Sequence, residues 1–321
     1  MTRFPSQISV ALPPDQDGYV GRECPAAACK GYFKITPGTG VQGENTCYCA
    51  YCGHRGTQDE CFTHEQIEYA KSIAINQATR ALLKDLKRRG FTHRRRGGFG
   101  LGLSLKVEGR PHPIRYYRER ALETHVECVG CGLRYAVYGA FAFCPDCSRH
   151  NSLQILEKNL ELVRKELDLS KTVEKELAEH LVGDALENIV SAFDAWGREA
   201  CGVNAAKASD PAAAARVRFQ DLERARTRVQ ALFQVDLAAP LSPAEWAAAI
   251  RGFQKRHVLA HRAGVVDEEY CRRADDPIAI VGRKLRIDTD EVVALAGIVM
   301  RLAAGLASAL RTGPPEAGDP A

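Results

Sequence analysis

The sequence predicts an α+β multidomain fold: two small cysteine-rich β modules lie around a mixed α/β basic segment and precede a mostly antiparallel five-helix bundle. Three observations predict it. Ten of the 12 cysteines lie in close groups before residue 150. After about Asn151 the apolar residues recur at spacings of three and four, which is helical periodicity. The first 150 residues carry a net charge of +7, and the rest of the chain carries −3.

The second cysteine group has the more regular spacing. Cys128-Val-Gly-Cys131 and Cys144-Pro-Asp-Cys147 are separated by twelve residues. A CxxC knuckle turns backbone N–H groups towards its sulfurs, and two knuckles complete a tetrahedron around zinc. The aromatic and apolar residues 132–143 suit a β-hairpin between the knuckles. The spacing therefore predicts a zinc ribbon with ligands Cys128, Cys131, Cys144 and Cys147.

The first cysteine group is less regular. It contains a CxxxxC knuckle and a CxxC-Gly knuckle, and residues 30–48 between them again suit a hairpin. We predict a second zinc set of Cys24, Cys29, Cys49 and Cys52. Cys47 is expected on a strand, while Cys61, His54 and His64 remain competing ligands. Both predicted sites have four thiolates and no open position, which is typical of structural zinc. Two structural Zn²⁺ ions would then stabilise modules too small for a large core.

Residues 63–90 are predicted to form one helix. Thr63 and Gln66 form a capping box, and Gly90 is a suitable stop. A mostly apolar stripe comprises Ile67, Ala70, Ile73, Ala74, Gln77, Ala78 and Ala81. Alternating residues from Leu101 to Val107 predict a strand, and a second short extended stretch is expected at 114–118.

Residues 84–120 form a basic segment with a net charge of +9 and interleaved aromatic residues. Arginine forks match phosphates, and aromatic faces stack on unpaired bases. The alternative is a solvated charged face that only improves solubility. We favour contact with RNA or another polyanion, through Lys87, Arg88, Arg89, Arg94, Arg95, Arg96, Arg115, Tyr116, Tyr117 and Arg118.

Five helices are predicted after residue 150. The first two follow the apolar spacing of 153–167 and 173–193. Asp210-Pro211 opens the third, which continues to about Leu232. Ser242 opens the fourth with a capping box, and this helix is expected to stop near Gly264. The fifth starts after Asp288 and runs to about Leu310. It is apolar, but Arg301 at its middle would cost ~2.5–3.5 kcal/mol at a bilayer centre, which favours a bundle helix.

The fourth helix carries the segment Arg256-His-Val-Leu-Ala-His261. At about 100° per residue, Arg256 and His261 lie about 140° apart around the helix, whereas His257 and His261 share a face. An Arg, then Asn, Asp or His, then three residues and a His resembles the motif of the HEPN superfamily (higher eukaryotes and prokaryotes nucleotide-binding). Arg256, His257 and His261 match it, residues 264–270 resemble the following segment of bacterial members, and the resemblance covers about 151–311.

The resemblance implies metal-independent RNA cleavage by a homodimer that assembles a composite site through its helical bundles. His261 would activate the ribose 2′-OH or protonate the leaving 5′-oxygen, and Arg256 would hold the phosphate. The products would be a 2′,3′-cyclic phosphate and a 5′-OH end. Toxin or defence roles are compatible with the superfamily. The alternative is a non-catalytic nucleic-acid-binding or protein-interaction protein with structural zinc and a dimerising bundle.

The expected organisation is a zinc ribbon at 20–62, a helix with a basic β segment at 63–120, a second ribbon at 121–150 and a HEPN-like bundle at 151–311. Residues 312–321 are expected to form a disordered tail. The start of the sequence has no apolar core of signal-peptide length. We therefore expect a cytoplasmic protein that does not enter a membrane.

Overall fold

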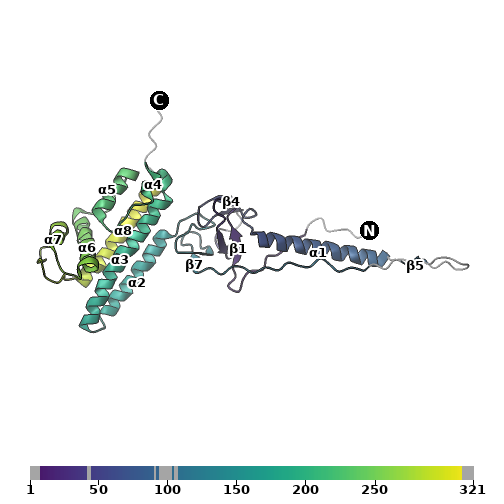
Figure 1. The fold of residues 1–321 in the computed structure, drawn as a ribbon, viewed down its shortest axis with the longest axis horizontal. Helices are drawn as coiled ribbons and strands as arrows, with labels where there is room; N and C mark the ends of the chain where they lie inside the picture. The colour runs from purple at the N-terminus through teal and green to yellow at the C-terminus, as the bar shows by residue number, and fades with distance from the viewer. Residues whose placement is uncertain (1–7, 42–44, 90–91, 94–102, 105–107, 313–321) are drawn as a thin grey trace, which may run out of the picture. The chain divides into compact units, whose positions relative to one another are not determined.

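Figure 1 shows the fold as a computed structural model, which describes residues 8–41, 45–89, 92–93, 103–104 and 108–312. The chain divides into two compact units, residues 1–149 and 150–321. In the described parts, the first unit contains short antiparallel strands and one long helix, and the second is helical. This arrangement confirms the predicted α+β fold class.

The N-terminal unit contains a four-stranded antiparallel sheet with the order β1-β2-β8-β7. Its strands are β1 (Val20–Glu23), β2 (Tyr32–Ile35), β7 (Thr124–Glu127) and β8 (Arg134–Val137). β1 and β2 form one hairpin, and β7 and β8 form another. The hairpins join where Lys34 pairs with Ala136 and Ile35 with Tyr135. The two cysteine-rich modules therefore share one sheet.

The hairpins differ from those predicted. The sequence pattern suggested hairpins between knuckles, at 30–48 and 132–143, and this prediction is wrong. Each hairpin instead encloses a knuckle: Cys24–Cys29 joins β1 to β2, and Cys128–Cys131 joins β7 to β8. A smaller hairpin of β3 (Thr46–Tyr48) and β4 (Arg55–Thr57) encloses Cys49 and Cys52. The physical reason is that the knuckle itself reverses the chain, so its flanking residues are already antiparallel.

The two modules also share an apolar core. Tyr48 N–H donates to the Pro145 carbonyl at 2.7 Å, and Phe143 N–H donates to the Ala50 carbonyl at 2.8 Å. These bonds join the β3–β4 hairpin to the Cys144–Cys147 knuckle. The buried core residues come from both modules: Phe33, Ile35, Cys47, Ala50, Cys61, Cys128, Leu133, Tyr135, Val137, Ala142 and Cys144. The modules therefore fold as one body.

The long helix α1 (His64–Arg89) begins at the predicted capping box. Gln66 N–H donates to Thr63 Oγ1, and Thr63 N–H donates to Gln66 Oε1, both at 3.2 Å. The buried positions of α1 are polar, namely Gln66, Ser72 and Asn76. Ile67 is 39% exposed, and Gln77 and Ala78 are also exposed. The predicted apolar stripe is therefore not the packed face of this helix.

A segment of extended chain explains the polar face of α1. Residues 108–120, called the strap, run antiparallel along the helix. Asn76 Nδ2 donates to the His112 carbonyl, and His112 N–H donates to Thr79 Oγ1 at 3.1 Å. Arg115 N–H donates to Ser72 Oγ at 2.9 Å. Main-chain groups need hydrogen-bond partners when they are covered, so polar helix residues take the place of a neighbouring strand.

The extended stretch predicted at 114–118 thus belongs to the strap and bonds to a helix. The strand predicted at 101–107 is described only at β6 (Leu103–Ser104), which pairs with β5 (Thr92–His93). Its remaining residues lie outside the described part of the chain.

The C-terminal unit contains five helices of 12 or more residues within 150–312. They are α2 (Ser152–Ser170), α3 (Lys175–Val203), α5 (Leu222–Phe233), α6 (Pro243–Arg262) and α8 (Thr289–Thr312). At the centre of their shared core, the Phe193 ring contacts the rings of Trp196, Phe219 and Phe253 at centroid distances of 5.7, 5.6 and 6.0 Å. α8 packs against α2, α3 and α6 (Figure 1).

Helix α8 is long and apolar enough to cross a membrane over Thr289–Arg311 by length and composition. In the bundle, one side of α8 is buried in the core through Val292, Leu295, Ala296, Val299, Leu302, Leu306 and Leu310.

The third predicted helix is divided in two. α4 (Pro211–Ala214) is one turn long, and α5 starts only after Asp221. Between them Phe219 is fully buried against Phe193 and Gly197. The buried carboxylate of Asp194 accepts from Phe219 N–H at 2.6 Å. Burial of Phe219 thus outweighs the helical periodicity of this segment. The short elements η1 (Ala205–Lys207) and α7 (Glu268–Ala274) are also additions to the predicted set.

Helix α6 begins at Ser242, which forms the predicted capping box with Glu245. It ends at Arg262, and Ala263 and Gly264 follow with positive φ angles of 50° and 76°. The predicted bounds of this helix are confirmed. His261 lies in its last turn.

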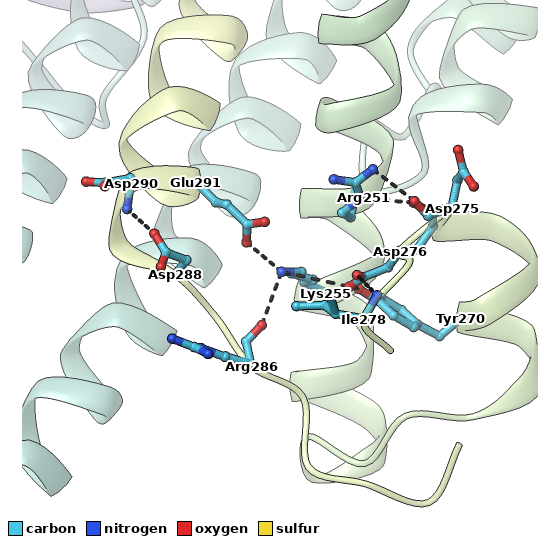
Figure 2. Close-up of polar contacts among 11 residues, drawn as sticks. Arg251, Lys255, Tyr270, Asp275, Asp276, Ile278, Arg286, Asp288, Asp290 and Glu291 are labelled. Carbon is cyan, nitrogen blue, oxygen red and sulfur yellow. Dashed lines mark hydrogen bonds and ion pairs between the residues drawn. The ribbon is translucent and has the colours of Figure 1, made fainter. Parts of the chain in front are cut away.

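A buried lysine ties α6 to the segment before α8 (Figure 2). The Lys255 side chain is 4% exposed, and its ammonium lies 2.5 Å from a Glu291 carboxylate oxygen. It donates to the Arg286 carbonyl at 3.1 Å and lies 4.0 Å from the buried Asp276 carboxylate. Asp276 also accepts from the Tyr270 hydroxyl at 2.6 Å. Lys255 therefore joins three chain segments beside the end of α6.

We expect Lys255→Met to destabilise the helical unit by about 3 kcal/mol, because the buried Asp276 carboxylate loses its cation. Both tryptophans, Trp196 and Trp246, lie in this unit, so urea unfolding followed by tryptophan fluorescence measures it selectively. The control is Lys175→Met, since the Lys175 side chain is 91% exposed. Equal stabilities of the two variants would contradict the anchoring role of Lys255.

Candidate metal centres and nucleic-acid interface

The four cysteine knuckles share one backbone design. The residue after each second cysteine has a positive φ: 49° at Lys30, 69° at Gly53, 75° at Gly132 and 55° at Ser148. The N–H of each of the last three donates to the carbonyl of the first cysteine of its knuckle, at 2.8–3.0 Å. This left-handed turn brings the two sulfurs of a knuckle to the same side.

The amides of the knuckles also face the sulfurs. Tyr51 N–H donates to Cys49 Sγ at 3.3 Å, and Gly130 N–H donates to Cys128 Sγ at 3.4 Å. Such donors stabilise negative charge on sulfur, which is the form that binds a metal. The turns are therefore built to hold thiolates.

The eight predicted ligands form two tetracysteine clusters. Within each cluster all sulfur atoms lie within 4.8 Å of one another, in the sets Cys24, Cys29, Cys49, Cys52 and Cys128, Cys131, Cys144, Cys147. The closest pairs are 3.7 Å apart in the first cluster, and 3.6 and 3.5 Å apart in the second. Tetrahedral zinc with Zn–S bonds of about 2.3 Å separates its sulfurs by about 3.8 Å. Each cluster can therefore hold a metal ion, and the all-sulfur tetrahedron matches zinc.

Burial and hydrogen bonding shift the pKa values of these thiols in opposite directions. Burial raises the pKa of Cys24 to about 11 and that of Cys131 to about 12. The pKa of Cys128 is lowered: burial opposes ionisation, but the N–H groups of Gly130 and Cys131 and the neighbouring thiols outweigh it. Four closely spaced thiols cannot all ionise unaided, so a bound dication would supply the missing compensation.

The competing ligands lie outside both clusters. Cys47 is on β3, as predicted, where its buried thiol contacts that of Cys61. His54 and His64 are exposed. Cys201 and Cys271 belong to the helical unit. None of these groups shares a site with the eight clustered cysteines among the described residues.

The strap presents part of the predicted basic surface. Arg115 and Arg118 are exposed, and the Arg115 guanidinium pairs with Glu68 at 2.9 Å. Tyr116 between them is 79% exposed. Tyr117 packs against Tyr69, with ring centroids 5.4 Å apart, and the exposed Tyr116 ring lies 6.1 Å from the same Tyr69 ring. Burial raises the pKa of Tyr117 to about 12. Tyr116 is thus available for a ligand, while Tyr117 fixes the strap to α1.

The other predicted basic residues do not join this group. Lys87 and Arg88 are exposed near the end of α1. Ser72, which bonds to Arg115, is fifteen residues earlier, and a rise of 1.5 Å per residue puts about 22 Å of helix between them. Arg89 is the last residue of α1, with its side chain outside the described part, and Arg94, Arg95 and Arg96 lie outside the described residues altogether.

The three motif residues of α6 also separate. The His257 and His261 rings are both exposed, with centroids 4.7 Å apart. Arg256 is half-buried on another side of the helix, and its Nε is buried without a hydrogen-bond partner in the described structure. One chain therefore presents a histidine pair, and its arginine does not converge on that pair.

No family model matches this chain. Searches of curated proteins and of solved structures also find no match. The resemblance to HEPN proteins consequently rests on the α6 motif and on the helical character of the unit that contains it.

Two parts of this arrangement were missed by sequence reasoning. The strap has no apolar periodicity, because it bonds through its main chain. The contacts of Lys255 join residues that are distant in sequence, and its charged neighbours in the motif favour an exposed position. The position of Lys255 between the apolar residues Phe253 and Val258 on a packed helix is the sequence feature that indicates its burial.

We expect the purified protein to contain two zinc ions per chain, one for each tetracysteine cluster. Cys144→Ser removes one ligand of the second cluster and should lower the zinc content to about one or less, because the two clusters share a core. Elemental analysis after gel filtration measures the content. Cys271→Ser, in the helical unit, should retain both ions, and a Cys144→Ser protein that also retains two would contradict the assignment.

Proposed function

We propose that this protein binds RNA through its zinc-stabilised N-terminal unit and cleaves it, without a catalytic metal, through its helical unit. The binding half of the proposal rests on one observation above all: the 79% exposed ring of Tyr116 lies between exposed Arg115 and Arg118 on the strap. A free aromatic face between two cations suits an unpaired base and its neighbouring phosphates.

The fixed backbone beneath this surface favours binding of single-stranded RNA. The main chain of the strap is hydrogen-bonded to the side chains of Ser72, Asn76 and Thr79, so the ring and the guanidinium groups project from a fixed backbone. A pre-positioned side chain loses less conformational freedom on binding. No recognition helix of a double-stranded DNA reader is evident in the sequence.

Tyr116→Ala should weaken binding of a fluorescein-labelled single-stranded RNA about 5- to 150-fold, which corresponds to the ~1–3 kcal/mol of a base–aromatic stack. Fluorescence anisotropy at fixed salt measures the affinity. Tyr138→Ala is the matched control, since Tyr138 is also exposed in this unit but lies outside the strap. Binding that is equally strong in both variants would exclude the strap as the RNA surface.

The cleavage half of the proposal rests on the exposed His257–His261 pair. An accessible imidazole can exchange protons with a ribose 2′-OH or a leaving 5′-oxygen. Because Arg256 lies on another side of α6, a second copy of the chain would have to complete the site, as the HEPN resemblance implies. The closed tetracysteine clusters leave no open metal position for this chemistry.

A second candidate function is binding without cleavage, in which the helical unit serves only for dimerisation. The observation that favours it is the half-buried Arg256, whose Nε is covered. A half-buried arginine on another side of α6 does not reach a phosphate beside His261 in the same chain unless its side chain moves.

We expect the protein to cut single-stranded RNA in EDTA, leaving 2′,3′-cyclic phosphate ends, and to leave a fully 2′-deoxy oligonucleotide intact. His261→Ala should reduce the rate at least about 100-fold, in line with loss of a general acid or base. His180→Ala is the control, because His180 is a 72% exposed histidine on α3. Absence of cyclic phosphate products, or equal rates for both variants, would leave the binding function alone.

A further inference from the structure

The N-terminal unit contains a pocket of about 370 Å³ that lies among strand ends and turns of both modules. β1 and β2 contribute Arg22 and Ile35. The turn after β2 contributes residues 36–39 and Val41, and the knuckle of the second cysteine cluster contributes Pro145 and Asp146. Its size is that of a small-molecule site. Its walls are about half polar and half apolar, and the apolar part includes two proline rings, Pro37 and Pro145.

A buried cation lines this pocket. Arg22 is 8% exposed. Its Nη1 donates to the Gly21 carbonyl at 2.8 Å, and its Nε donates weakly to Gln58 Oε1 at 3.4 Å. No carboxylate lies within 4.0 Å of its guanidinium among the described residues, and burial lowers its pKa. A buried arginine with only neutral acceptors retains capacity for further hydrogen bonds.

An acidic group lines the same pocket. The Asp146 carboxylate is half-buried between Cys144 and Cys147, and its Oδ2 accepts from Val41 N–H at 2.5 Å. This bond fixes the carboxylate against the turn after β2. A pocket with one fixed anion and one buried cation disfavours a free phosphate. It favours a neutral ligand that has hydrogen-bond acceptors on one edge and donors on another.

We propose that this pocket binds an unstacked guanine base of single-stranded RNA, an inference that rests on the RNA-binding function proposed above. Guanine offers O6 and N7 as acceptors, which suit the Arg22 guanidinium, and N1–H and the 2-amino group as donors, which suit the Asp146 carboxylate. The apolar walls, with Leu133 and the two prolines, cover the faces of the ring. Adenine has an amino donor where guanine has O6, and it lacks the N1 donor, so it cannot satisfy both charged groups.

Two sites of different character then act on one strand. Tyr116 on the strap stacks on any base, whereas the pocket selects guanine. Sequence-specific recognition of RNA commonly depends on such splayed bases, because the paired edges are inaccessible in a helix. The protein would therefore prefer single-stranded RNA with an exposed guanine over RNA without one.

The test compares two labelled RNA oligonucleotides, identical except for a single central guanine in one and adenine in the other. We expect the guanine oligonucleotide to bind the wild-type protein about tenfold more tightly by fluorescence anisotropy. Replacing the guanine by inosine, which lacks the 2-amino group, should remove part of this preference. Equal affinities for the guanine and adenine oligonucleotides would overturn the proposal.

The variants separate this inference from the general RNA-binding function. Asp146→Asn should abolish the guanine preference while retaining the affinity for the adenine oligonucleotide, and Arg22→Gln should do the same. Zinc content must match the wild type, since Asp146 lies between two cluster cysteines. Tyr116→Ala should instead weaken the binding of both oligonucleotides by the same factor, so that the ratio of the two affinities is unchanged. An Asp146→Asn protein that folds, retains zinc and still prefers guanine would refute the pocket, whereas failure of the wild type to bind either oligonucleotide would refute RNA binding itself.

Discussion

The sulfur tetrahedron is the constraint on which the N-terminal unit depends. Each cluster combines two knuckles. Cysteines of different knuckles are at least 20 residues apart in the first cluster and at least 13 residues apart in the second. Three of the four knuckles are the turns of the β1–β2, β3–β4 and β7–β8 hairpins. Metal ligation would therefore fix strand pairing, and strand pairing through β2 and β8 places the two clusters over one core. Without the ions, these short strands have little apolar surface to keep them together.

The helical unit is organised by a different interaction. Aromatic rings around Phe193 fill its centre, and large side chains from α3, α6 and the Phe219 segment meet there. Near the end of α6, a buried Lys255 replaces apolar packing with an ion and hydrogen-bond network. Apolar packing is tolerant of direction, whereas these bonds fix the geometry of the segments they join.

The sequence predicted those features that depend on local spacing. The eight ligands follow from knuckle spacing, and the bounds of α6 follow from the Ser242 capping box and Gly264. Strand pairing was predicted wrongly, because a knuckle can lie either inside a hairpin or between two hairpins, and spacing alone does not distinguish these cases. The polar face of α1 and the break before α5 were missed for a common reason. Both result from contacts with distant chain, the strap in one case and the Asp194–Phe219 bond in the other.

The attachment of the strap has a consequence for how this surface can change over evolution. Ser72, Asn76 and Thr79 bind the main chain of residues 112–115, so these hydrogen bonds do not involve the outward side chains of the strap, and the Arg115–Glu68 pair is an exposed ion pair. Substitution at Arg115, Tyr116 or Arg118 can then alter what is bound at little cost in folding free energy. Selection for a new ligand and selection for stability act on different atoms of the same segment. Such a surface can diverge quickly on a fold that stays constant.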